Sequence, residues 1–217
     1  MTTIELTDAG IGTGLGAPVP ALTLAITPGT PMVIAVETDE RPLMVSMLLG
    51  GRIKPDSGSV TIDGATDLSE LRHRTALVDT PFVAEPSPGI SLAVIVAEEF
   101  SFSGRAAKRG AVRDFLSSHG LADYARIEVR ALPPADRVRV FSELALLRDG
   151  VETIIITSPE RHGGAPAEWF GYLDSLAERG ITVVIVTDAA SRDLLLSLGA
   201  RDALAAPTTI TTTDASK

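Results

Sequence analysis

The chain has 217 residues, enough for one sizeable domain with a buried core. Its 45% hydrophobic and 22% charged composition is ordinary for a globular protein, and the absence of cysteine excludes disulfides and thiolate metal sites. A net charge of −9 argues against a nucleic-acid partner, because no basic stripe is present to neutralise phosphates. The start, MTTIELTDAG, lacks the features of a signal peptide, and no apolar run reaches the roughly 18–20 residues that span a bilayer. We therefore expect a cytoplasmic protein without direct membrane insertion.

The first thirty residues have the pattern of antiparallel strands. Thr3–Leu6 and Ala21–Ile26 are β-like runs, and a Thr-Pro-Gly-Thr turn leads from the second run into Met32–Val36. The glycine-rich stretch Gly10–Gly16 resembles a nucleotide loop, but a proline-containing strand follows it rather than a helix. We interpret this stretch as a hairpin connection.

Strands and helices alternate in the rest of the chain. We expect helices from Pro42 and at Ser103–Ser118, Ala135–Arg148, Pro166–Arg179 and Ala190–Leu198, and strands at Ser59–Ile62, Ala76–Val78, Thr153–Ile156 and Ile181–Val186. The near-continuous β-branched runs predict an α/β fold with a parallel sheet covered on both faces. A polar, Thr-rich tail at residues 207–217 is of the kind that ends in disorder.

A strand, a tight connection and a helix over residues 33–51 form the frame of a phosphate site. The connection, Glu37–Arg41, has no glycine and no lysine and carries three carboxylates. Two unit charges 4 Å apart repel by about 4 kcal/mol at an effective dielectric constant near 20, so the connection disfavours a triphosphate. Pro42 also removes an N–H donor from the helix start. Since Thr38 or Asp39 can cap this helix, we expect the chain itself to satisfy the helix terminus.

Three segments carry a resemblance to a known family. They are GRIKPDSGSV (Gly51–Val60) followed by Asp63-Gly64, LPPADRVRVFSELALLRDGVETIIITSP (Leu132–Pro159), and ITVVIVTD (Ile181–Asp188). In this order they resemble the ATP-binding domain of ABC transporters, over roughly residues 2–200. The resemblance implies one domain at 1–206, with a P-loop NTPase-like core, an N-terminal antiparallel β-subdomain and a small helical subdomain at about 90–135.

The family's chemical positions are changed in this sequence. The phosphate-loop pattern G-x-x-x-x-G-K-[ST] falls on residues 36–43, where its four defined positions are Val36, Arg41, Pro42 and Leu43. The magnesium-sensing glutamine falls on Thr80, the signature LSGGQ on Leu132–Asp136, the Walker B aspartate and the catalytic glutamate on Thr157 and Ser158, and the switch histidine on Asp188. The resemblance thus implies a degenerate member, and we predict no catalytic, cofactor-binding or metal-binding residues and no tight binding of ATP or Mg²⁺.

Some isolated polar residues allow a functional and a structural interpretation. Asp79, Glu160 and Asp188 could form a carboxylate cluster at the strand ends, where α/β sites lie; we favour roles as caps and turn residues. The lone histidines His73, His119 and His162 are interpreted as neither catalytic nor ligating. Arg137 and Arg139 are expected on a solvated helix face.

The preferred hypothesis is a non-hydrolysing scaffold or regulatory subunit. It would lie at the inner face of the plasma membrane through an integral membrane protein or an ABC-type homologue, because in the family a groove between the core and the helical subdomain grips a helix of a transmembrane partner. ATP normally joins two such domains, so its loss favours a monomer or a hetero-complex. One alternative is a functional ATP-binding subunit paired with a competent homologue. Another is a Rossmann-like enzyme, which a structure without the helical subdomain would favour.

Overall fold

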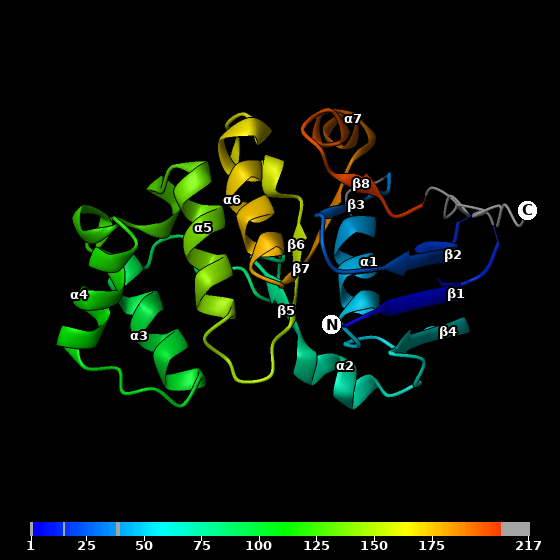
Figure 1. Ribbon diagram of the computed structural model, residues 1–217, viewed down its shortest axis with the longest axis horizontal. Helices are drawn as coiled ribbons and strands as arrows, with labels where there is room; N and C mark the ends of the chain where they lie inside the picture. Colours follow the sequence, from blue (N-terminus) through cyan, green and yellow to red (C-terminus); the bar gives the residue numbers. More distant parts are fainter. Residues whose placement is uncertain (1, 15, 38–39, 205–217) are drawn as a thin grey trace, which may run out of the picture.

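The computed structural model describes residues 2–14, 16–37 and 40–204, and it contains two sheets and a set of covering helices (Figure 1). The strands are β1 (Ile4–Ile11), β2 (Val19–Ile26), β3 (Met32–Ala35), β4 (Ser57–Ile62), β5 (Thr75–Val78), β6 (Thr153–Thr157), β7 (Thr182–Thr187) and β8 (Arg201–Asp202). The α-helices are α1 (Arg41–Leu49), α2 (Leu68–Arg74), α3 (Leu92–Phe102), α4 (Arg109–Ser118), α5 (Pro134–Ala145), α6 (Pro166–Glu178) and α7 (Ala189–Ser197). Short 3₁₀ turns lie at η1 (Ala122–Tyr124), η2 (Val129–Ala131) and η3 (Pro159–His162). The predicted α/β class is confirmed.

The smaller sheet is antiparallel, with strand order β2-β1-β4, so the predicted N-terminal antiparallel strands and their hairpin are confirmed. Gly58 lies inside β4, where the family-like segment enters the sheet. Its φ is +66°, and a Cβ there would stand 2.2 Å from the carbonyl oxygen of Thr7. Only glycine fits such a close approach of two backbones.

The larger sheet is parallel, with strand order β5-β6-β7-β3-β8. Side chains alternate between its faces, as the pleat requires: Ile155 and Val184 pack against one core cluster, and Ile154 and Val183 against another. The first cluster includes three α1 side chains and the inner face of β1, so α1 lies between the two sheets (Figure 1). This packing fixes the amino end of α1 at the carboxyl edge of the parallel sheet.

The second cluster joins the parallel sheet to α5, α6 and α7, which contact its other face, and continues outward to α3 and α4 (Figure 1). The helix predicted at Ser103–Ser118 is confirmed only from Arg109 onward, where α4 lies, and its predicted start is wrong. Ser103 is the C-cap of α3 rather than a helix start, and Gly104 adopts φ +72°, which stops α3. The apolar spacing of Leu92, Ile95, Val96 and Phe100, the buried face of α3, was the signal that the prediction overlooked.

Three further elements differ from the predictions. The helix α2 and the short strand β8 were not anticipated, and α5 ends three residues before Arg148. The predicted tail at 207–217 lies outside the described residues. Within the described part of the chain, no helix combines the length and the apolar character needed to cross a membrane.

Candidate functional site: the carboxyl edge of the parallel sheet

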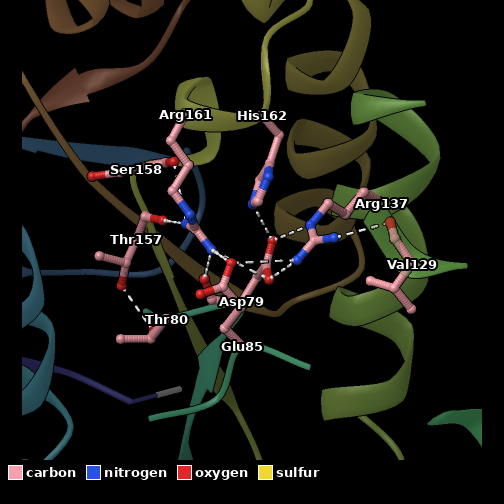
Figure 2. Close-up of polar contacts among 9 residues, drawn as sticks. All are labelled: Asp79, Thr80, Glu85, Val129, Arg137, Thr157, Ser158, Arg161 and His162. Atoms are coloured by element: carbon pink, nitrogen blue, oxygen red, sulfur yellow. Dashed lines mark hydrogen bonds and ion pairs between the residues drawn. The ribbon is translucent and has the colours of Figure 1, made fainter. Parts of the chain in front are cut away.

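The polar residues at the ends of β5 and β6 meet in one cluster (Figure 2). Asp79 follows β5 and is only 6% exposed. Thr157 ends β6, and η3 follows directly and supplies Arg161 and His162. Because parallel strands end at the same edge of the sheet, these segments are brought together although they are far apart in sequence. Asp79 was predicted as a cap or turn residue. It does lie in a bend, with φ +50°, but the prediction did not anticipate that its carboxylate is buried and paired with an arginine.

Arg137 forms a two-point ion pair with Asp79. Its Nε donates to Asp79 Oδ2 and its Nη2 to Oδ1, both at 2.7 Å, while Nη1 donates to the carbonyl of Val129 at 3.1 Å. Arg137 is 4% exposed, and its guanidinium lies 5.1 Å from the ring centroid of Phe141. The predicted solvated position of Arg137 is therefore wrong. Since Arg137, Phe141 and Leu144 share one helix face, the spacing could have revealed the burial.

Arg139, which the sequence analysis considered together with Arg137, is less buried. Arg139 is half-buried and pairs with Asp136 of the same helix at 2.7 Å. Of the two arginines, only Arg139 stays at the helix surface, so the expectation holds for it in part.

Arg161 and His162 complete the shell around Asp79. Arg161 Nη2 lies 3.3 Å from Asp79 Oδ1 and 3.3 Å from Glu85 Oε1, and the guanidinium also donates to the carbonyls of Asp79 and Thr157. His162 Nε2 lies 2.9 Å from Asp79 Oδ2, although it is not aligned for a directed hydrogen bond. His162 is therefore not the lone histidine that the sequence suggested, although its interpretation as neither catalytic nor ligating stays a prediction.

The electrostatics of the cluster favour an ionised Asp79. Burial acts to raise the pKa of Asp79, but the contacts with His162 and Arg137 and the charges of Arg137 and Arg161 outweigh it and hold this pKa below its ordinary value. Ligand atoms of Asp79, Glu85 and His162 lie within 4.8 Å of one another, a spacing that a metal ion could use. However, two guanidinium groups already neutralise the two carboxylates, so a cation would have to displace them.

A chain of buried hydroxyls connects this edge to α1. Thr157 Oγ1 donates to Ser46 Oγ at 2.7 Å, so the 2.8 Å bond between Thr80 and Thr157 has Thr80 as its donor. All three residues are at most 1% exposed. Thr80 and Thr157, at the ends of β5 and β6, thus bond to each other, and Thr157 bonds to Ser46 of α1.

The amino end of α1 has a different character. Val36 N–H donates to Thr187 O at 2.9 Å, and Pro42 occupies the first turn of the helix. Glu40 is the N-cap residue, and its side chain makes no capping hydrogen bond. The caps proposed from sequence, Thr38 and Asp39, lie outside the described residues. No described side chain therefore replaces a phosphate at this helix end.

The three carboxylates considered together in the sequence do not form one group. Asp188 is the N-cap of α7 and accepts from Ser191 N at 2.7 Å, which confirms the cap interpretation for this residue. Glu160 is half-buried, and burial raises its pKa, with the nearby charge of Asp188 adding to the effect. The carboxylate that does join Asp79 is Glu85, in a proline-rich loop whose sequence gave no sign of it.

His73 and His119, interpreted as neither catalytic nor ligating, lie away from this edge. The ring of His73 fills the space beside Gly150, and that of His119 packs against Phe115 with centroids 4.3 Å apart.

A groove of about 410 Å³ opens beside the cluster. Its walls come from the end of β5, the loop at residues 83–90, and the facing sides of α3 and α5. Ile95, Phe141 and Leu144 give it an apolar floor, and Glu85, Glu98, Glu99 and Arg148 provide charge. The groove thus lies where α3, α5 and the end of β5 meet.

Comparisons with known proteins identify the fold. No family model matches the sequence, and no curated protein matches it. Solved structures do match. A nucleotide-free ATP-binding cassette from an ABC transporter has a TM-score of 0.67 at 15% identity, covering 91% of this chain and 85% of that chain. A dimeric bacterial ABC transporter cassette gives 0.66 at 20% identity, covering 88% and 90%.

A third similar structure is a bacterial Atm1-family ABC exporter with ATP bound. Its TM-score is 0.61 at 14% identity, and the match covers 88% of this chain and 35% of that chain. Identities at this level establish architecture rather than activity. The chain has the fold of an ABC transporter ATP-binding cassette.

Proposed function

We propose that the protein is a catalytically degenerate ABC-cassette-like protein that acts as a non-hydrolysing scaffold or regulatory subunit, in complex with an integral membrane protein or an ABC-type homologue. It binds neither ATP nor Mg²⁺ tightly. The observation that carries this proposal is the filled carboxyl edge of the parallel sheet, where Thr80, Thr157 and Ser46 bond to one another.

The residues at this edge do not fit a nucleotide-bound magnesium ion. Mg²⁺ prefers carboxylate and phosphate oxygens in octahedral geometry, whereas the position of the Walker B carboxylate holds Thr157, whose hydroxyl is already engaged. Arg161 also places a positive charge on the carbonyl of Thr157. A cation entering here would meet a guanidinium instead of a carboxylate.

The amino end of α1 does not fit a triphosphate either. A phosphate loop works through converging N–H groups and close backbone approach. Pro42 has no N–H, and Val36 and Arg41 carry a Cβ where the family has glycine. Glu37 and Glu40 are both exposed and add negative charge around the site. Each of these features opposes an anionic ligand.

The scaffold role is supported by what the chain retains. The sheets, the helical layer and the groove between them persist without the family's chemical residues. In the family this groove grips a partner helix, and the similar exporter shows that the fold occurs within membrane transport proteins. Partner binding through the groove needs no phosphate-site residue.

Calorimetry with ATP and Mg²⁺ on the purified chain tests the loss of nucleotide chemistry. We expect no binding in the micromolar range and no phosphate release above that of buffer, whereas a competent ABC cassette measured in parallel gives both. Mass measurement in solution should give the same species with and without ATP. Micromolar binding or turnover would instead favour the alternative, a functional ATP-binding subunit beside a competent homologue.

The partner class needs a separate test. The tagged full chain is used to capture proteins from detergent-solubilised membranes of the source organism, beside a Val83→Asp variant that places a charge on the wall of the groove. We expect an integral membrane protein that the wild type retains and the variant loses. Recovery of soluble proteins alone would contradict the membrane partner.

A further inference from the structure

Three arginines gather at the amino edge of the parallel sheet, the edge opposite the candidate site. Arg52 follows the carboxyl end of α1, Arg72 lies on α2, and Arg148 follows α5. Arg52 Nη2 and Arg148 Nη2 donate to the same oxygen, the carbonyl of Thr75 at the start of β5, at 3.0 and 3.3 Å. Two guanidinium groups therefore converge on a single acceptor.

The acceptors that hold these arginines are uncharged. Arg52 Nη1 donates to the carbonyl of Gly50 at 2.5 Å, and Arg72 Nη1 donates to the carbonyl of Gly51 at 2.9 Å. Among the residues that the structure describes, no carboxylate forms an ion pair with Arg52, Arg72 or Arg148. The cluster thus differs from the one around Asp79, where carboxylates balance the guanidinium groups.

The charges of the three arginines act on one another. Burial, together with the charges of Arg148 and Arg72, lowers the pKa of Arg52 to about 10. The carbonyls at the end of α1 offset only about half an elementary charge, whereas three guanidinium groups are present. The positive charge also acts on Asp67 and Glu99, but neither carboxylate forms an ion pair with the cluster. Uncompensated positive charge therefore remains here, in a protein whose net charge is −9.

Much of the donor capacity of the cluster is unused. A guanidinium carries five N–H donors in a fixed planar fork, and the described residues accept one hydrogen bond each from Arg72 and Arg148. Arg72 is exposed, and Arg52 and Arg148 are half-buried, so a ligand from solvent can reach a partly desolvated positive site. Arginine forks match phosphate oxygens in two-point contacts, and a phosphate dianion supplies the missing negative charge.

We propose that Arg52, Arg72 and Arg148 form a binding site for a phosphate group, carried by a small soluble molecule or by a lipid headgroup. Arg52 is fixed between the end of α1 and the start of β5 and supplies a constant positive charge. Arg72 and Arg148 supply the unused forks. The site lies at the carboxyl end of α1, whereas the phosphate-loop position lies at its amino end, so this proposal is independent of the proposed function.

The full chain is titrated with inorganic phosphate and with glycerol 3-phosphate at constant ionic strength, and backbone amide signals are followed by NMR. We expect saturable binding with a dissociation constant of about 1 mM or lower, with signals near Gly50 and Thr75 shifting most. Sedimentation with phosphatidylcholine vesicles, with and without phosphatidic acid, tests the lipid source. Binding only to the soluble phosphates identifies a soluble ligand, and additional binding to the phosphatidic acid vesicles identifies a headgroup. No saturable binding of any of these probes would overturn the proposal.

Variants locate the binding site. Arg72→Gln and Arg148→Gln should each weaken phosphate binding about tenfold, as expected when a charge-assisted hydrogen bond is lost. Arg72→Gln is the decisive variant, because this exposed side chain makes a single described bond and its loss should leave the fold intact. The control for the double variant is Arg105→Gln with Arg126→Gln, which changes the net charge equally at exposed positions outside the cluster. Equal effects of the two double variants would overturn the assignment to this site.

Calorimetry with ATP on the double variant Arg72→Gln, Arg148→Gln separates this site from the nucleotide position of the family. ATP also carries phosphates, so it can bind weakly to the arginines of the wild type. ATP binding that the double variant loses would support the arginine site. ATP binding that the double variant keeps would contradict the proposed function, while the phosphate titration still decides the arginine site. The two proposals are therefore tested separately.

Discussion

The amino end of α1 and the carboxyl ends of β5 and β6 differ in how their polar groups are satisfied. At α1, the exposed Glu40 occupies the N-cap without a capping bond, and Glu37 nearby is exposed as well. At the strand ends, Asp79 is 6% exposed and contacts Arg137, Arg161 and His162. Both regions belong to the frame that resembles a nucleotide site. Only at the strand ends do side chains of the protein itself satisfy the polar groups.

Burial explains this difference. Backbone donors at an exposed helix end can bind water, so a missing ligand leaves little free-energy penalty there. Buried carboxylates and hydroxyls cannot form hydrogen bonds with bulk water, so each needs a partner within the protein. An anion or cation can therefore be lost from an exposed site without replacement, whereas its loss from a buried edge requires new side-chain contacts.

The largest test of this comparison is Asp79→Ala. It leaves Arg137 buried without its carboxylate, and breaking a buried pair costs about 3–5 kcal/mol. Urea unfolding should show this loss of stability. Arg137→Met should cost less, because Arg161 and His162 still contact Asp79.

Two controls accompany this measurement. The combined Asp79→Leu and Arg137→Met variant should recover part of the stability, since removing both charges leaves neither unpaired. Asp114→Ala breaks the exposed pair with Arg113 and should cost under about 0.5 kcal/mol. If Asp79→Ala cost no more than Asp114→Ala, the strand-end cluster would not be the tightly coupled region that we describe.

The hydroxyl chain should show an intermediate effect. Thr157→Val keeps the shape of the side chain but leaves the Thr80 donor and the Ser46 acceptor without a partner, at a cost of about 1–3 kcal/mol. Thr153→Val on the same strand is a matched control, because Thr153 Oγ1 is buried and has no partner among the described residues. Its removal should be neutral or stabilising, as measured by thermal unfolding. Equal losses from both variants would show that the hydroxyl chain contributes nothing specific.

Acid titration should sharpen the comparison further. The pKa of Asp79 is held below its ordinary value, so its contribution to stability is fully present above an unfolded-state pKa of about 3.9 and is lost as the pH falls through the lower folded-state value. The stability difference between the wild type and Asp79→Asn should therefore narrow between about pH 5 and about pH 2. Urea unfolding across this range measures it. A constant difference would mean that Asp79 does not titrate with a depressed pKa.

The repeating parts of the fold could be predicted from sequence because local patterns encode them. Runs such as Thr153–Ile156 and Ile181–Val186 are apolar and β-branched, and both are strands of the parallel sheet. The helix α3 was missed although its apolar spacing is clear, since Ser103 was interpreted as a helix start instead of an end.

The candidate site was harder to predict because its contacts are long-range. Asp79 and Arg137 are 58 positions apart in the sequence. The residues around Asp79 do not indicate Arg137 as its partner, and those around Arg137 do not indicate Asp79. The helix-face position of Arg137 indicated burial, but it did not indicate which carboxylate would compensate the charge. Glu85 is an exposed residue in a loop without periodicity, so no local pattern indicated that it would join Asp79.

The smallest expected effect on stability is at the exposed amino end of α1. Glu40→Lys replaces a negative charge with a positive one at the amino end of α1, where the helix dipole favours an anion. Because the position is exposed and no capping bond is lost, the cost should be only about 0.5–1 kcal/mol in low salt and should shrink as salt screens the charge. Glu5→Lys on β1 is the control, since that exposed position lies on a strand and meets no helix terminus. Urea unfolding at two salt concentrations measures both variants. A loss as large as that of Asp79→Ala would mean that the helix end depends on its carboxylate as strongly as the buried cluster does, and the contrast between the two regions would disappear.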